Sequence, residues 1–367
     1  MLSLNPSFVR ASFAIGSILL GGALLVSGCG GGGGGATVPT STPIPTFTPA
    51  PNATATPTPV PGTAFADEFN AGSLDRTKWT TLDNSNRLQR TQFGNQPDFG
   101  QDTDGTRFMR VKIDSFLPDD TVRAAGILQF YGTELAANQK IARGTGVEFQ
   151  ARMRMSNPER GGLVGSFFLF GQKGNFGGNP PLSFDEIDHE VLTNGVNANP
   201  PYTWTNTYND FRVPQTGVPS GDSYTDPTKT IGLAEPTTTG YAAGNWNVYR
   251  VVWRAGQVQW FINDQLIRTE TSGVVPDDAL GVRFNMWAAT APPAGWAAAF
   301  DDTLKPANTL ADNKTYSLDV DWVRVKSLSA TTTGAVRTPS SLQVIPLSSA
   351  EITRGLAGAD YHSNARR

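Results

Sequence analysis

Residues 147–155 read Val-Glu-Phe-Gln-Ala-Arg-Met-Arg-Met, and this stretch decides the fold class. Its apolar side chains stand at every second position and alternate with charged or amide side chains. A period of two is typical of a β-strand that buries one face and leaves the other in water. The stretch therefore predicts a strand in a sheet that covers an apolar core.

Further strands are predicted around this one. Residues 249–254 alternate in the same way, and residues 316–325 read as another strand. Residues 258–262 and 266–270 flank Asn263-Asp264, which predicts a β-hairpin. The sequence contains no convincing amphipathic helix of three turns. Many short strands with Gly- and Pro-rich connections over residues 64–328 indicate one all-β domain, a sandwich or jelly roll.

The first 28 residues have the layout of a lipoprotein signal peptide. Arg10 precedes an apolar run from Phe13 to Val26 that is short of the about 20 residues of a membrane-spanning helix. The run ends in Val-Ser-Gly-Cys at residues 26–29, which resembles the bacterial lipobox, and Cys29 is the only cysteine of the chain. We therefore expect lipidation at Cys29; an ordinary signal peptide that contains a cysteine is the alternative.

A spacer and a tail flank the predicted domain. Residues 29–63 are first Gly-rich and then Thr- and Pro-rich, a composition that cannot bury a core and forms an extended linker. Residues 329–367 are polar and Ser/Thr-rich, and the sequence leaves open whether they are a disordered tail or a small appended element. This organisation predicts an extracytoplasmic lipoprotein, held at the outer membrane or cell surface through its lipid anchor alone.

Charge excludes one class of partner. The net charge is −3, and Lys and Arg form no cluster along the chain. A nucleic-acid-binding domain normally carries a basic patch, so no nucleic acid is expected. We expect a monomer that acts on a neutral polymer.

The strand that carries chemistry lies at residues 184–192. Side chains alternate along a strand, so Glu186, Asp188 and Glu190 point to one face. Three like charges in a row would be costly in a structural strand, whereas on a concave face they separate the pKa values of neighbouring carboxyl groups. A retaining glycosidase needs such a pair, one nucleophile and one acid/base.

The Glu-x-Asp-x-Glu pattern resembles the catalytic signature of family 16 glycoside hydrolases, the laminarinase, lichenase, agarase and carrageenase group. Other stretches resemble strands of that family in the family's order, at residues 65–79, 146–155, 165–170, 247–268, 284–287 and 321–325. The resemblance implies a concanavalin A-like jelly-roll sandwich of two antiparallel sheets with a concave substrate cleft. It implies that Glu186 is the nucleophile, that Glu190 is the acid/base and that Asp188 orients them.

The chain departs from the family pattern in two ways. His189 stands where the family usually has an apolar residue that faces the space between the sheets, so we interpret it as a hydrogen-bonded core histidine rather than a catalytic or pH-sensing group. The motif also lacks the extra residue of laminarinase-type members, which favours other members of the family without naming the substrate.

Aromatic and amide side chains are the candidates for sugar binding, because sugars stack on aromatic rings and hydrogen-bond through their hydroxyl groups. Asn285 and Trp287 should share the cleft face, with Trp287 as a stacking platform or, alternatively, part of the core. Three more candidates share one face of a short segment: Trp204, Asn206 and Tyr208. Among them, Asn206 is expected to contact a sugar or Glu190. The last candidate is Trp296, which lies in a loop after Trp287.

No cofactor is expected for catalysis. The resemblance implies a structural calcium ion with Asp321 as its side-chain ligand, and Asp319 shares its face. Calcium takes about 6–8 oxygen ligands, most of which would be backbone carbonyls here, so the sequence leaves calcium binding open. The two histidines and one cysteine do not form a zinc motif.

These observations predict a retaining endo-glycosidase that hydrolyses or transglycosylates a β-linked polysaccharide such as a β-glucan or galactan. The alternative is a non-catalytic carbohydrate-binding surface lipoprotein. Because all three carboxylates of residues 186–190 are present, the sequence favours the enzyme. A structural surface lipoprotein would explain the anchor and the linker but not this strand.

Overall fold

The computed structural model describes residues 63–156, 160–173, 183–193, 205–213, 233–234, 244–271, 275–292, 296–328 and 344–346. All of them lie in one compact unit that spans Thr58–Arg367. The predicted signal peptide, Cys29, most of the linker and Trp204 lie outside the described residues. The described part contains no helix with the length and hydrophobicity that crossing a membrane requires.

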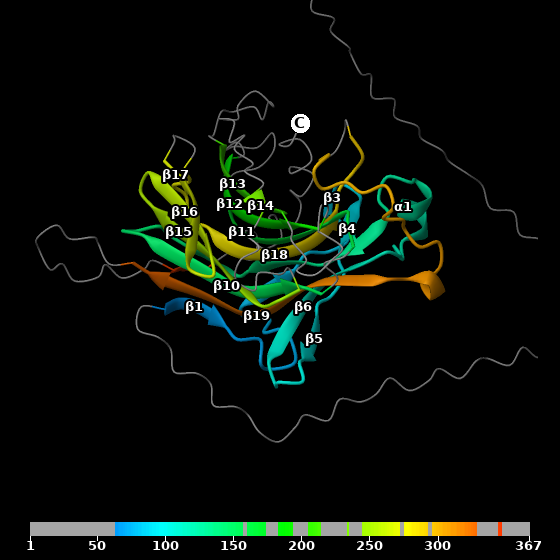
Figure 1. The fold of residues 1–367 in the computed structure, drawn as a ribbon, viewed down its shortest axis with the longest axis horizontal. Helices are drawn as coiled ribbons and strands as arrows, with labels where there is room; N and C mark the ends of the chain where they lie inside the picture. The colour runs from blue at the N-terminus through cyan, green and yellow to red at the C-terminus, as the bar shows by residue number, and fades with distance from the viewer. Residues whose placement is uncertain are drawn as a thin grey trace, which may run out of the picture. The chain divides into compact units, whose positions relative to one another are not determined.

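Most described residues belong to two β-sheets (Figure 1). The eleven-stranded sheet has the order β17 (Gln265–Glu270), β16 (Gln257–Ile262), β15 (Asn247–Arg254), β10 (Val147–Met155), β19 (Thr315–Ser327), β6 (Arg107–Asp114), β7 (Phe130–Gly132), β4 (Thr91–Phe93) and β3 (Arg87–Leu88). Two more strands join it, β1 (Thr63–Asp67) on β19 and β5 (Asp98–Gln101) on β6.

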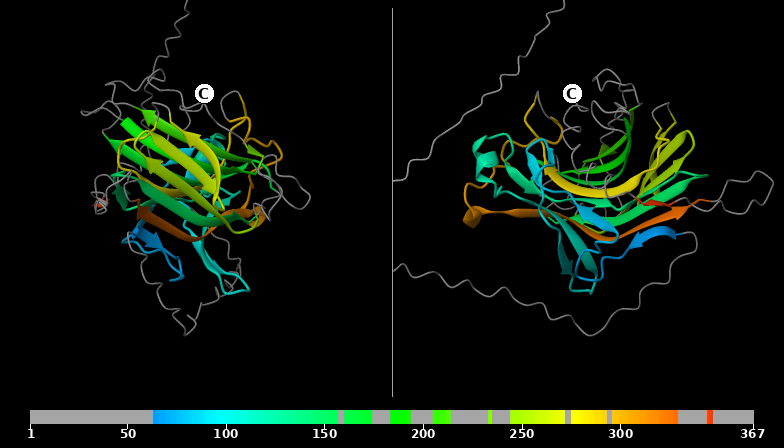
Figure 2. Two further views of the ribbon diagram at one scale, coloured as in Figure 1. Left: turned by 60° about the vertical axis from the view of Figure 1, so that its left-hand side comes forward. Right: turned by 180° about the vertical axis from the view of Figure 1, so that it is seen from behind.

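The seven-stranded sheet has the order β14 (Leu233–Ala234), β13 (Thr205–Val213), β12 (Ser183–Leu192), β11 (Leu163–Lys173), β18 (Gly281–Ala288), β8 (Glu134–Ala137) and β2 (Trp79–Thr81). Neighbouring strands of both sheets run antiparallel, and β4 with β7 is the parallel exception among the described pairs. Figure 2 shows the pronounced curvature of β18. Smaller elements are α1 (Asp120–Ala124), η2 (Leu310–Asp312) and the pair of β9 (Gln139–Ile141) with β20 (Val344–Pro346).

The two sheets pack face to face through one apolar core. The eleven-stranded sheet contributes residues such as Phe149 and Trp253, and the seven-stranded sheet contributes Phe167, Ile187 and Phe284. Each strand supplies every second residue to this core, since side chains alternate between the two faces of a sheet. The structure thus confirms the predicted jelly-roll sandwich of antiparallel sheets.

The predicted strands are found where the alternation lies. β10 spans the predicted residues 147–155, with its apolar positions buried. β16 and β17 form the predicted hairpin, and its turn residues Asn263 and Asp264 have φ of 46° and 65°. Two successive residues with positive φ are typical of the tight turns that match the twist of a hairpin.

Candidate active site

Strand β12 carries the three carboxylates on the face turned away from the core. Its register against β11 pairs Glu186 with Phe170, Asp188 with Phe168 and Glu190 with Ser166. Ile187 and Val191, which occupy positions of the opposite strand face, belong to the core between the sheets. The predicted common face of Glu186, Asp188 and Glu190 is therefore present.

The carboxylates line one pocket. Four strands or loops contribute its walls, and its lining residues are Leu88, Ser166, Phe168, Glu186, Asp188, Glu190, Asn285 and Trp287. Glu186 and Glu190 are each 2% exposed, and Asp188 is 1% exposed. Burial of a carboxylate costs free energy unless partners compensate for the lost hydration. Three buried carboxylates on adjacent same-face positions are therefore better explained by chemistry than by packing.

A hydrogen bond connects the backbone of β12 to the opposite sheet. Trp260 of β16 donates from its indole Nε1 to the carbonyl oxygen of Asp188, at 2.9 Å. Trp260 is completely buried in the core. This hydrogen bond crosses between the sheets and fixes the strand beneath the pocket at its central residue.

His189 lies in the core, as predicted. Its Nε2 is 3.2 Å from the carbonyl oxygen of Arg250, and its Nδ1 is 3.1 Å from Nδ2 of Asn206. A carbonyl only accepts, so Nε2 carries the proton and Nδ1 accepts from Asn206. Burial lowers the pKa of His189 to about 3, so the ring is neutral at physiological pH.

The prediction that Asn206 and Tyr208 face the cleft is wrong. The register of β13 pairs Asn206 with Val191 and Tyr208 with His189, which are core positions of β12. Both side chains are completely buried, and Tyr208 belongs to the core cluster. The two residues do share a face, but it is the other face, and Asn206 contacts His189 instead of Glu190.

Asn285 and Trp287 line the pocket from β18, on the predicted face. Trp287 is also completely buried. It stacks on Trp296 with ring centroids 6.0 Å apart and planes at 24°. Trp287 therefore forms both a wall of the pocket and part of a small apolar cluster, and its role as a sugar platform stays a prediction, as does that of Trp296.

Four residues of the site were not predicted from the sequence: Leu88, Ser166 and Phe168, which line the pocket, and Glu134, which binds Asn285. Ser166 lines the pocket between Glu190 and Asn285, and only its spacing of two from Phe168 could have indicated this. Glu134 of β8 is buried on the same face, where Arg283 donates to it at 2.9 Å and Asn285 at 3.2 Å. No motif marks Glu134 in the sequence, because its partners come from a strand about 150 residues later.

The surroundings of Asp321 do not fit a calcium ion. Asp321 lies at a bulge of β19, and its carboxylate is paired with the guanidinium of Arg152. The neighbouring Asp319 is paired with Arg110 at 2.7 Å and with Arg154 at 3.1 Å. Calcium needs several oxygen ligands that are free of competing cations, so it would have to displace these ion pairs.

One acidic group among the described residues has a metal-like spacing. Asp185, Asp277 and Asp278 offer oxygens within 4.8 Å of one another. However, Asp185 Oδ2 already accepts the backbone N–H groups of Asp277 and Asp278, both at 2.8 Å. These two hydrogen bonds hold the loop before β18 against the start of β12, which explains why the three carboxyl groups lie close together.

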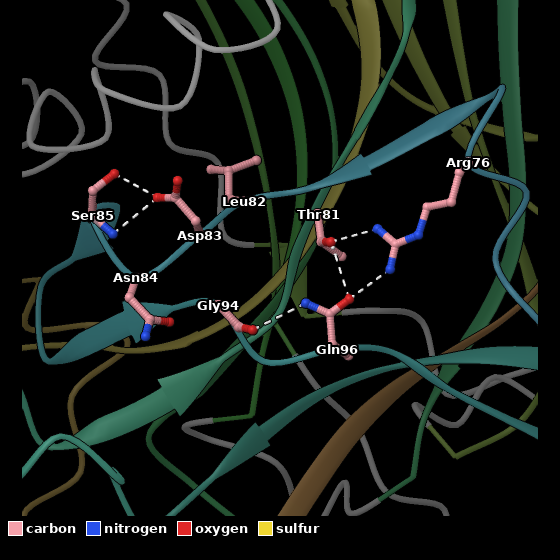
Figure 3. Close-up of a pocket in the computed structure, with 8 residues that line it drawn as sticks. All are labelled: Arg76, Thr81, Leu82, Asp83, Asn84, Ser85, Gly94 and Gln96. Carbon is pink, nitrogen blue, oxygen red and sulfur yellow. Dashed lines mark hydrogen bonds between the residues drawn. The ribbon is translucent and has the colours of Figure 1, made fainter.

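A second hollow lies at the end of β2 and is shown in Figure 3. Arg76 donates there to Thr81 and to Gln96, both at 2.8 Å. The Ser85 hydroxyl holds the pKa of Asp83 below its usual value, so Asp83 cannot donate a proton near neutral pH. The polar side chains of this hollow are thus hydrogen-bonded to one another.

A pocket on a β-sandwich that holds three carboxylates of one strand meets the requirement of a glycoside hydrolase, whose reaction uses a pair of carboxyl groups. The chain belongs to one family of these enzymes: residues 101–323 match the family model of glycosyl hydrolases family 16. The family expected from the sequence is thereby confirmed.

Individual relatives are distant. The beta-glucanase of Brevibacillus brevis is 24% identical over 267 residues, which cover 73% of this chain and 83% of that protein. The solved structure of Bacillus licheniformis beta-glucanase has a TM-score of 0.46 at 19% identity, over 73% of this chain and 100% of that one. The laminarinase catalytic domain of Thermotoga petrophila has a TM-score of 0.48 at 15% identity, over 72% and 96%.

Proposed function

We propose that this protein is a retaining endo-glycosidase that cleaves a β-linked polysaccharide, with a β-glucan as the first substrate to test. The observation that carries the proposal is the buried row of Glu186, Asp188 and Glu190 in one pocket. The named activity of the Brevibacillus brevis relative supports the choice of a β-glucan.

Two carboxyl groups perform the proposed reaction. Glu186 attacks the anomeric carbon while Glu190 donates its proton to the departing glycosidic oxygen, so that an ester joins the sugar to Glu186 and the other half of the polymer leaves. Glu190, now a carboxylate, then removes a proton from water as the water oxygen attacks the same carbon. Glu186 is released as a carboxylate and Glu190 is protonated again; a sugar hydroxyl in place of water would give transglycosylation.

The strand geometry sets a condition on this mechanism. Positions four apart on a strand have Cα atoms about 13 Å apart at about 3.3 Å per residue. A retaining enzyme brings its two carboxyl groups to about 5–5.5 Å. Glu186 and Glu190 must therefore lean toward each other over Asp188, which is buried between them on the same strand face. The proposed role of Asp188 is to orient both.

A reducing-sugar assay on lichenan, laminarin, xyloglucan, agarose and carrageenan tests the proposal. The wild type should release reducing ends from at least one β-glucan, and Glu186→Gln and Glu190→Gln should each abolish this release. Asp185→Asn is the matched control, because Asp185 lies on the same strand and is bonded to a loop rather than lining the pocket. Full activity of Glu186→Gln would refute the assigned roles.

We also propose that the domain is tethered outside the cytoplasm by a lipid on Cys29, through the linker of residues 29–63. The support is the lipobox-like stretch at residues 26–29. The wild type should incorporate labelled palmitate and sediment with membranes, whereas Cys29→Ser should do neither. Equal labelling of both proteins would exclude Cys29 as the attachment site.

A further inference from the structure

A row of polar side chains crosses the curved sheet at the level of Glu190. Ser166 of β11 lies opposite Glu190, and Asn285 of β18 lies opposite Ser166. Glu134 of β8 lies opposite Asn285. Directly opposed residues of antiparallel strands share a face, with Cα atoms about 4.5–5.5 Å apart. The row is therefore contiguous with the residue proposed as acid/base.

Glu134 determines which way the Asn285 amide points. Its carboxylate accepts from Asn285 Nδ2 at 3.2 Å and from Arg283 Nη1 at 2.9 Å. Burial raises the pKa of Glu134, and the ion pair with Arg283 and the hydrogen bond from Asn285 oppose that rise by favouring the ionised form. A carboxylate held ionised by this cation has no proton to donate, so only the NH₂ side of the amide can face it. Asn285 Oδ1 is consequently turned away from Glu134, and it is buried without a hydrogen-bond partner among the described residues.

Ser166, which lies directly opposite Asn285 in the strand register, offers a second buried polar atom. Its side chain lines the pocket and is 2% exposed. Its Oγ forms no hydrogen bond with any group in the described ranges. A buried polar atom without a partner costs stability, so two such atoms on opposed residues that line one pocket are better explained by a ligand that binds them.

We propose that Ser166 and Asn285 (the hydroxyl pair) bind one sugar hydroxyl next to Glu190, and that Glu134 is the positioning residue that orients Asn285 for it. The sugar hydroxyl donates to Asn285 Oδ1 and accepts from the Ser166 hydroxyl. This inference rests on the proposed function and narrows its substrate class. The sugar must carry a free hydroxyl at this position, since a methyl ether or a sulfate ester there has no proton to donate.

Removal of one hydroxyl tests the pair. In the full chain, Ser166→Ala should lower kcat/KM on lichenan by about tenfold, the effect of one lost hydrogen bond to a sugar. Its Tm should not fall, because the substitution removes a buried hydroxyl that has no partner. Ser156→Ala is the matched control, because Ser156 Oγ is equally without a partner in the described part of the chain but lies outside the pocket. This control should keep wild-type kinetics.

The positioning role of Glu134 is tested by rescue. In Glu134→Gln, Arg283 retains the amide oxygen and the new NH₂ group faces Asn285, which must turn its own oxygen toward it and its NH₂ into the pocket. This inversion should lower kcat/KM by about tenfold or more. In the double variant Glu134→Gln/Asn285→Asp, one carboxylate oxygen at position 285 accepts from the new NH₂ group and the other faces the pocket as an acceptor. The double variant should therefore recover most of the lost kcat/KM. A residue that only stabilises the fold would give no such recovery.

The outcomes separate this inference from the proposed function. If the wild type cleaves lichenan and Ser166→Ala keeps its kcat and KM, the hydroxyl pair is refuted while the proposed function stands. If the wild type cleaves none of the polysaccharides, binding of a mixed-linkage glucan tetrasaccharide to Glu186→Gln is measured by calorimetry. Weaker binding after Ser166→Ala supports the pair, and unchanged or undetectable binding overturns it.

Discussion

Acid should destabilise this protein through His189. The folded-state pKa is about 3 because burial disfavours the imidazolium, whereas an unfolded histidine has a pKa of about 6.5. Between these values the unfolded chain binds one more proton than the folded chain, so stability rises with pH and is lost as pH falls below about 6.5. At about 1.4 kcal/mol per pH unit, the loss between pH 7.5 and pH 4.5 from this residue is about 3 kcal/mol.

Urea unfolding at pH 7.5, 5.5 and 4.5 measures this loss. His189→Gln keeps an N–H group that can donate to the carbonyl oxygen of Arg250, and it removes the titrating imidazole. Between pH 7.5 and pH 4.5, the fall in the free energy of unfolding should therefore be about 3 kcal/mol smaller in this variant than in the wild type. The wild type and His189→Gln share all other titrating groups, so the contribution of the carboxylates cancels when the pH dependence of one protein is subtracted from that of the other. Parallel pH curves for the two proteins would refute the assignment of a neutral buried His189.

Three further predictions concern the frame of the site. Asn206→Ala should lower the free energy of unfolding by about 1–3 kcal/mol, as expected for the lost partner of a buried group, but should leave KM unchanged; a raised KM would return Asn206 to the cleft. Trp260→Phe removes the bond to the Asp188 carbonyl and should lower both Tm and kcat, as thermal melts and initial rates would show. Calcium and EDTA should leave Tm unchanged because Asp321 is paired with Arg152, and a calcium-dependent rise in Tm would contradict this.

The sequence predicted what depends on periodicity along one strand. The alternation at residues 147–155 located β10, and the spacing of Glu186, Asp188 and Glu190 placed them on one face. The position of His189 between two of these carboxylates correctly predicted its burial in the core. These inferences need only the two-residue period of a strand.

The sequence could not predict what depends on register between strands. Asn206 and Tyr208 share one face, as their spacing predicts, but a shift of one residue in the pairing of β13 with β12 decides which face it is. The contact of Glu134 with Asn285 likewise requires β8 to lie next to β18. At Asp321, a bulge and the pairing with Arg152 are tertiary features that the strand pattern does not contain.

The anomeric configuration of the first product tests the central claim most directly. ¹H NMR during hydrolysis of lichenan by the full chain should show the β-anomer first, as a double displacement through Glu186 requires, with the α-anomer appearing only by mutarotation. Glu186→Gln should slow the same signal by at least about a thousandfold. An α-anomer formed first, or an undiminished rate in Glu186→Gln, would contradict the mechanism.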